Sequence, residues 1–149
     1  MNVFVAAHSG LRWIVLILLV VAIVNAVSKK NKNSYTKNDR LINLFAMLMI
    51  HIQILLGIVL YLFNHVGLGG RISYSEGWMK NPMYRFFGME HIIMMVLAMI
   101  FVTIGNKKSK TKEFAAQKHG AIITFYLITL ILVLAGIPWP FRGLGTGWF

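Results

Sequence analysis

Apolar residues along the chain gather in four long segments that are separated by short polar stretches. The segments cover residues 2–27, 41–63, 83–104 and 120–137. Each has about twenty mostly apolar residues, the length that an α-helix needs to cross the hydrocarbon core of a bilayer. Because 58% of the 149 residues are hydrophobic, little sequence remains for a domain outside the membrane. The pattern predicts an all-α integral membrane protein, a single four-helix bundle that comprises residues 1–149.

The polar stretches predict where these helices begin and end. Asn81–Pro82 is typical of a helix cap followed by proline in the first turn, so we expect the third helix to start there. Gly105–Asn106 is expected to end it. The glycine-rich segment 64–80 and the Pro-Trp-Pro-Phe segment 138–141 predict irregular structure with aromatic side chains at the membrane interface.

The positive charge is concentrated in two of the three loops, although the formal net charge is +11. The stretches 29–40 and 107–118 hold ten of the fifteen basic residues. By the positive-inside rule these two loops face the cytoplasm, which places both termini on the non-cytoplasmic side of a bacterial inner membrane. Topology and anionic lipid account for this charge, so it does not indicate nucleic-acid binding.

Histidines recur in these apolar segments, with His8, His51, His91 and His119 falling one per segment. A polar ring among membrane helices needs a partner, and four on one small bundle indicate bound haem. His8 and His91 are expected in the outer half of the bilayer, on two parallel helices that can lie diagonally in the bundle. We therefore expect these two as axial ligands of one haem iron. His51, near the midplane, and His119, at the inner end, are candidates for ligands of a second haem or for lining a quinone or proton site.

Charged residues accompany the outer histidine pair. Arg12 follows His8 by four residues and shares its helix face, at a depth where an unpaired guanidinium is costly. An anionic partner is therefore expected, either Glu90 or a haem propionate. Arg85, which precedes His91 by one and a half turns, is expected to hold a second propionate near the interface. Without a cofactor, Arg12 and Glu90 would form a structural ion pair.

The chain contains no cysteine, so covalent attachment of haem is excluded and any haem b is expected to be bound non-covalently. Five stretches carry a resemblance to known proteins: His8-Ser-Gly-Leu-Arg-Trp13, His51-Ile-Gln-Ile-Leu-Leu-Gly57, Arg85 with Glu90-His91, Lys118-His119 and Ile137-Pro-Trp-Pro140. On these stretches nearly the whole chain resembles a family of small bacterial four-span membrane proteins that are labelled cytochrome b-like. More remotely, the arrangement is similar to the histidine-ligated helical bundles of cytochrome b561 and haem A synthase.

Two functions are consistent with these patterns. The first is a b-type haem protein that transfers electrons to or from quinol or a larger respiratory complex. The second is a cofactor-free accessory subunit of a larger membrane complex, in which the histidines and the arginine serve as hydrogen-bonding contacts between helices. An optical spectrum of the purified protein distinguishes them.

Overall fold

The computed structural model describes residues 3–65, 74–144 and 148 of the protein. Its long helices are α1 (Val3–Lys29), α2 (Lys37–His65), α4 (His91–Thr111) and α5 (Ala115–Gly136), and the short helix α3 (Pro82–Arg85) leads into α4. Within these ranges there is no strand, and four helical segments are long and apolar enough to cross a membrane. The prediction of an all-helical protein with four such helices is confirmed.

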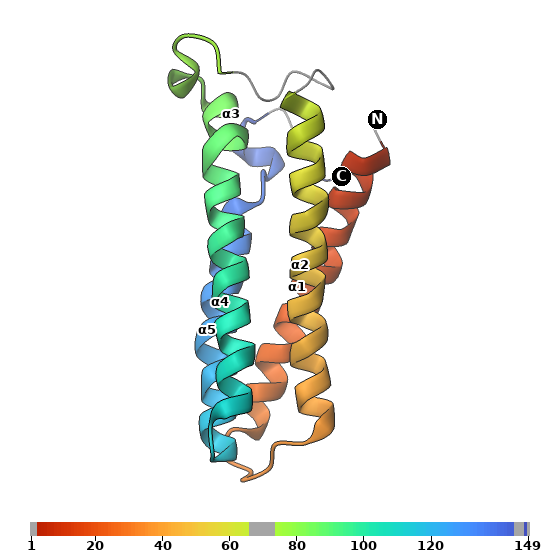
Figure 1. Ribbon diagram of the computed structural model, residues 1–149, viewed down its shortest axis with the longest axis vertical. Helices are drawn as coiled ribbons and strands as arrows, with labels where there is room; N and C mark the ends of the chain where they lie inside the picture. Colours follow the sequence, from red (N-terminus) through yellow and green to blue (C-terminus); the bar gives the residue numbers. More distant parts are fainter. Residues whose placement is uncertain (1–2, 66–73, 145–147, 149) are drawn as a thin grey trace.

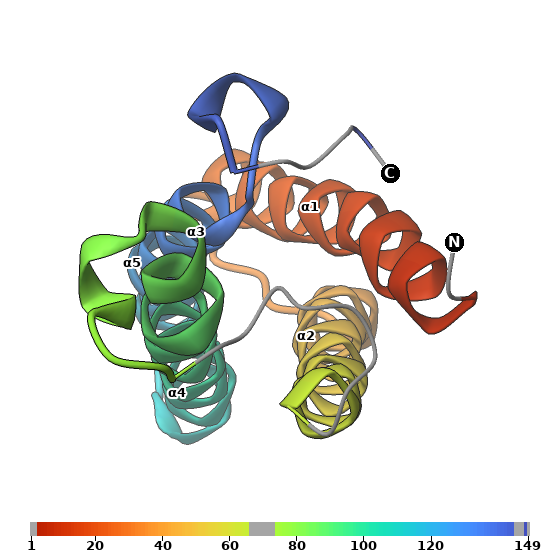
Figure 2. The ribbon, with the colours of Figure 1, turned by 90° about the horizontal axis from the view of Figure 1, so that it is seen from above.

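The four long helices form a ring in chain order. α1 packs against α2 and α5, and α4 packs against α5 and α2, so α1 and α4 lie on one diagonal of the bundle (Figure 2). Both ends of the chain lie toward the same end of the bundle, which we call the terminal end (Figure 1). The turns between α1 and α2 and between α4 and α5 lie at the opposite, loop end.

The core is built from small and branched side chains on one face of each helix. On α1 this face carries Val15, Leu19, Ala22 and Ala26, all at most 2% exposed and spaced by three or four residues. The outward faces of the helices are also apolar. Apolar residues on both faces are typical of helices that have lipid on one side and protein on the other.

The start of the third membrane segment is confirmed. The side chain of Asn81 accepts hydrogen bonds from the backbone N–H groups of Met83 and Tyr84, at 3.0 and 3.2 Å, and Pro82 occupies the first turn of α3. A five-residue π-helical turn, η2 (Phe86–Glu90), then joins α3 to α4. The segment predicted as one regular helix therefore contains a wider turn just before His91.

The predicted end of this segment at Gly105–Asn106 is wrong, because α4 continues to Thr111. A Cβ atom on Gly105 would lie 2.7 Å from the Cβ atom of Phe125 on α5. Gly105 therefore allows α4 and α5 to approach closely, a common role of glycine between membrane helices. Asn106 is only 3% exposed and its amide donates to the sulfur of Met47 at 3.2 Å.

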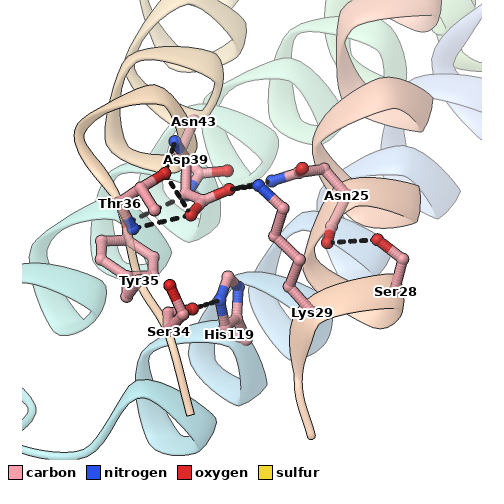
Figure 3. Close-up of polar contacts among 9 residues, drawn as sticks. All are labelled: Asn25, Ser28, Lys29, Ser34, Tyr35, Thr36, Asp39, Asn43 and His119. Atoms are coloured by element: carbon pink, nitrogen blue, oxygen red, sulfur yellow. Dashed lines mark hydrogen bonds and ion pairs between the residues drawn. The ribbon is translucent and has the colours of Figure 1, made fainter. Parts of the chain in front are cut away.

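At the loop end, a buried carboxylate connects α1 to α2 (Figure 3). Asp39 has no exposed surface and accepts hydrogen bonds from Lys29 Nζ at 2.6 Å, Asn25 Nδ2 at 2.8 Å and the Thr36 backbone N–H at 2.7 Å. At the terminal end, two short 3-10 turns, η1 (Trp78–Lys80) and η3 (Pro140–Arg142), interrupt the irregular segments. Residues 66–73 of the predicted glycine-rich loop lie outside the described residues.

Candidate functional site

The rings of His8 and His91 lie close together in the terminal half of the bundle, on the diagonal pair α1 and α4. Their centres are 6.2 Å apart and their planes are inclined by 73°. Two imidazoles that bind one metal ion from opposite sides have ring centres about 6 Å apart, because each metal–nitrogen bond is about 2 Å long. The spacing therefore matches that of two ligands of one ion.

His91 is held in one orientation by the last turn of α5. Its Nδ1 lies 2.7 Å from the carbonyl oxygen of Gly136. Since a carbonyl oxygen can only accept, Nδ1 must carry the proton of this hydrogen bond, which leaves Nε2 of the neutral ring free to accept a hydrogen bond or bind a metal. The π-helical turn η2 immediately precedes this residue, and such turns occur frequently at functional sites.

His8 is positioned by two residues of α2. The amide of Gln53 donates to the carbonyl oxygen of His8 at 2.8 Å, a hydrogen bond between α2 and α1. A Cβ atom on Gly57 would lie 3.2 Å from Cε1 of His8, so the absence of a side chain there makes room for the ring. The Nδ1 atom of His8 is buried and has no hydrogen-bond partner among the described residues.

A cavity adjoins the two rings. It has a volume of about 90 Å³ and is lined by His8, His91, Gln53, Tyr61 and aliphatic side chains of α2 and α4. This volume is smaller than the roughly 300–1,000 Å³ that is typical of sites enclosing a whole small molecule or cofactor, so the helices around it would have to separate for a large ligand to enter. The walls are almost entirely apolar, with a few polar groups that could orient a ligand.

The cavity is linked to the segment that precedes α3, at the terminal end, through two phenols. The hydroxyl of Tyr61 is hydrogen-bonded to that of Tyr74, and Tyr74 donates to the carbonyl oxygen of Gly88 at 3.0 Å. Burial and the hydrogen bond to Tyr61 raise the pKa of Tyr74 to about 12. Tyr74 therefore stays neutral at physiological pH and keeps the proton that it donates to Gly88.

Arg12 is buried without an acidic partner among the described residues. It is 8% exposed, one guanidinium nitrogen donates to the carbonyl oxygen of Trp148, and Nε has no hydrogen-bond partner there. The predicted partner Glu90 instead accepts from Arg85 at 2.7 Å. The hypothesis of a structural Arg12–Glu90 pair is therefore wrong. Glu90 pairs instead with Arg85, which lies five residues earlier on the same helical segment.

His51 lies apart from the outer pair, and both of its ring nitrogens have partners. Nδ1 is 2.8 Å from the carbonyl oxygen of Met47, one turn earlier on α2, and Nε2 is 3.3 Å from the hydroxyl of Thr103 on α4. These contacts are those of a histidine that hydrogen-bonds between helices.

His119 is fully buried at the loop end (Figure 3). Its Nε2 is 2.9 Å from the carbonyl oxygen of Ser34, and its ring meets that of Tyr35 edge to face at 5.0 Å. The turn between α1 and α2 therefore covers His119. The contacts of His51 and His119 do not include each other, so the structure does not bring them together as a second histidine pair.

The sequence analysis missed three contributors to the site: Gly57, Gly136 and Tyr61. A glycine inside a predicted membrane helix indicates a close approach of some group, so Gly57 and Gly136 carried a signal that was not used. No feature of the sequence indicates a role for Tyr61, because the sequence does not show which face of α2 lines a cavity.

Comparison with protein-family models, with curated proteins and with solved structures finds no match for this chain.

Proposed function

We propose that this protein binds one haem b non-covalently and transfers electrons in the membrane, with His8 and His91 as the axial ligands. The observation that carries the proposal is the 6.2 Å separation of the two rings beside a cavity. Two facing imidazoles are the usual ligands of electron-transferring b-type haem. The described residues contain no cluster of three or more His, Cys, Asp or Glu side chains that could hold a bare metal ion, which favours a macrocycle that needs only two protein ligands.

The residues around the cavity have the chemistry that such a group needs, and α2 and α4 would have to separate to admit a ring of its size. The hydrogen bond to Gly136 leaves one nitrogen of His91 free, and a buried nitrogen of His8 lacks a partner. The aliphatic walls suit a flat apolar ring system, and Gly57 lets the His8 ring pack against α2. Haem bound between two imidazoles supplies one-electron redox chemistry and has no open coordination position, so the proposal is electron transfer rather than oxygen activation.

Arg12 is the residue that would pair with a propionate. Its charge is buried without an acidic partner among the described residues, and a carboxylate carried by the cofactor would compensate it. Arg85 was expected to hold a second propionate, but it is already paired with Glu90. The proposal therefore assigns the anion to Arg12.

The proposal is limited to one haem, because the nitrogens of His51 are engaged with Met47 and Thr103. The excess of lysine in the two loops at the loop end supports an orientation with that end in the cytoplasm of a bacterium. The proposed redox partner is quinol or a subunit of a respiratory complex. Both lie in the same membrane, so either can come into contact with the haem site.

The first experiment is an optical spectrum of the purified full-length protein. A reduced-minus-oxidised difference spectrum with a sharp α band, together with about one haem per chain by extraction, is expected for bis-histidine ligation. A colourless preparation without extractable haem would contradict the proposal. It would favour a cofactor-free accessory subunit.

The ligands are tested by substitution. His8→Ala and His91→Ala should each abolish the low-spin haem signal, because loss of either imidazole breaks the six-coordinate state and weakens retention. His51→Ala is the matched control, since it removes a histidine from the same bundle, and it should keep the wild-type spectrum and haem content. Loss of the signal in His51→Ala together with its survival in both outer variants would show that the pairing is wrong.

A further inference from the structure

The C-terminal end of α5 has an unusual set of hydrogen-bond partners. The last carbonyl groups of a helix have no partner within the helix and need donors from elsewhere. Here the following residues include Pro138 and Pro140, which have no backbone N–H to donate. Side chains supply most of the missing donors.

Each carbonyl at this end has a donor. Trp139 Nε1 donates to Leu134 at 2.9 Å. A single nitrogen of the Arg142 guanidinium, Nη1, donates to the carbonyl oxygens of Ala135 and Ile137, at 2.7 and 3.2 Å. The carbonyl oxygen of Gly136, between those two, accepts from His91 Nδ1. Arg142 therefore holds the carbonyl groups on both sides of the one that orients His91.

Arg142 also reaches His91 through a second contact. Its guanidinium carbon lies 4.6 Å from the centre of the Phe86 ring, which is 1% exposed. The Phe86 ring centre is in turn 5.8 Å from that of His91. The guanidinium thus bonds the backbone on both sides of the Gly136 carbonyl and makes a cation–π contact with Phe86, whose ring lies beside His91.

We propose that Arg142 is a positioning residue for His91. By fixing the last turn of α5, it keeps the Gly136 carbonyl in place as the acceptor for Nδ1–H. The imidazole is thereby held as a single tautomer whose Nε2 is free, and the ring is ordered before any ligand arrives. The inference rests on the proposed function only in taking haem iron as the group that Nε2 would bind.

The test measures the tautomer of His91 directly. The full-length chain is labelled with ¹⁵N-histidine, prepared from haem-deficient cells and studied by NMR at a pH where the ring is neutral. His91→Gln identifies the His91 signals. In the wild type, the proton should reside on Nδ1 alone.

Arg142→Met removes the donors but keeps an unbranched side chain, and it should give a mixture of the two tautomers. Arg142→Lys restores a cationic donor and should recover most of the wild-type pattern. Lys80→Met, which removes a positive charge from the outer loop without touching α5, should leave the signals unchanged. If Arg142→Met does not accumulate, Arg142→Leu, which also has no donor, is the second variant, and the same expectation applies.

A wild-type tautomer pattern in Arg142→Met, or the same change in Lys80→Met, would overturn the inference. With haem added, Arg142→Met should bind about tenfold more weakly than the wild type, at the lower end of the usual effect of losing support for a metal ligand. Failure of the wild type to bind haem would contradict the proposed function. The tautomer measurement would still decide whether Arg142 positions His91.

Discussion

At the scale of single residues, the most informative observation is a charge that lies where a charge is expensive. Arg12 is 8% exposed on a helix long and apolar enough to cross a membrane, and it contacts a backbone carbonyl and the Trp13 ring, but no acid among the described residues. A buried cation is strongly disfavoured unless an anion compensates it. The sequence predicted the need for a partner. It could not predict that Glu90 pairs with Arg85, because side-chain reach depends on the π-helical turn between them.

The Arg12 hypothesis is tested with two porphyrins. Wild-type protein should bind haem about 10–100-fold more tightly than haem dimethyl ester, whose propionates carry no charge, since a hydrogen bond to a charged group contributes about 1.5–3 kcal/mol. Arg12→Leu should bind both forms with equal affinity. Binding is measured by optical titration of the cofactor-free protein.

The control for this comparison is Arg85→Leu. Arg85 already pairs with Glu90, so this variant should keep the wild-type preference for free propionates. An unchanged preference in Arg12→Leu would show that Arg12 does not hold the cofactor's carboxylate.

At the scale of helices, α4 and α5 are packed closely enough that one glycine decides their separation. The sequence predicted that Gly105 ends a helix, because glycine is common at helix ends. The structure shows Gly105 inside α4, facing Phe125 and Tyr126. One sequence cannot distinguish these two uses of glycine, since the difference depends on what lies opposite.

Gly105→Ala should destabilise the bundle by about 1–3 kcal/mol, the usual cost of overpacking. The new Cβ atom would lie 2.7 Å from the Cβ atom of Phe125, which cannot move without the backbone of α5. The free energy of unfolding can be measured in mixed micelles with increasing SDS.

Gly120→Ala is the matched control on α5. A Cβ atom there meets nothing within 4 Å, so the substitution should be neutral or should stabilise the helix by up to about 1 kcal/mol. Equal stability of the two alanine variants would contradict the packing role of Gly105.

At the scale of the whole molecule, charge separates the two ends of the bundle. The loop end carries most of the lysines, and we expect it to face the cytoplasm. Because the chain has no cysteine, single cysteines report position without background. Lys80→Cys should react with a membrane-impermeant maleimide in intact cells after outer-membrane permeabilisation, whereas Lys30→Cys and Lys112→Cys should react only after lysis.

Labelling of Lys30→Cys in intact cells would reverse this orientation. All three positions are exposed in the structure. A lack of labelling in intact cells would therefore report the side of the membrane and not burial of the residue in the bundle.

The sequence was sufficient for the architecture, because length and apolar periodicity determine which segments can cross a membrane. It also placed His8 and His91 at similar depth on helices that could be diagonal. It could not determine the rotation of each helix about its own axis, and that rotation decides which histidines meet. His51 and His119 are buried or partly buried in the same bundle, yet they face other partners.

The arrangement of the histidine pair also bears on the order of events during synthesis. His8 lies on α1, whereas His91 and the Gly136 carbonyl that orients it belong to α4 and α5, which are synthesised later. At about 5–20 residues per second, the first half of the site waits several seconds for the second. A molecule that binds both rings can therefore be captured only after α5 has formed and packed against α4, so its presence would mark a bundle in which all four long helices have assembled.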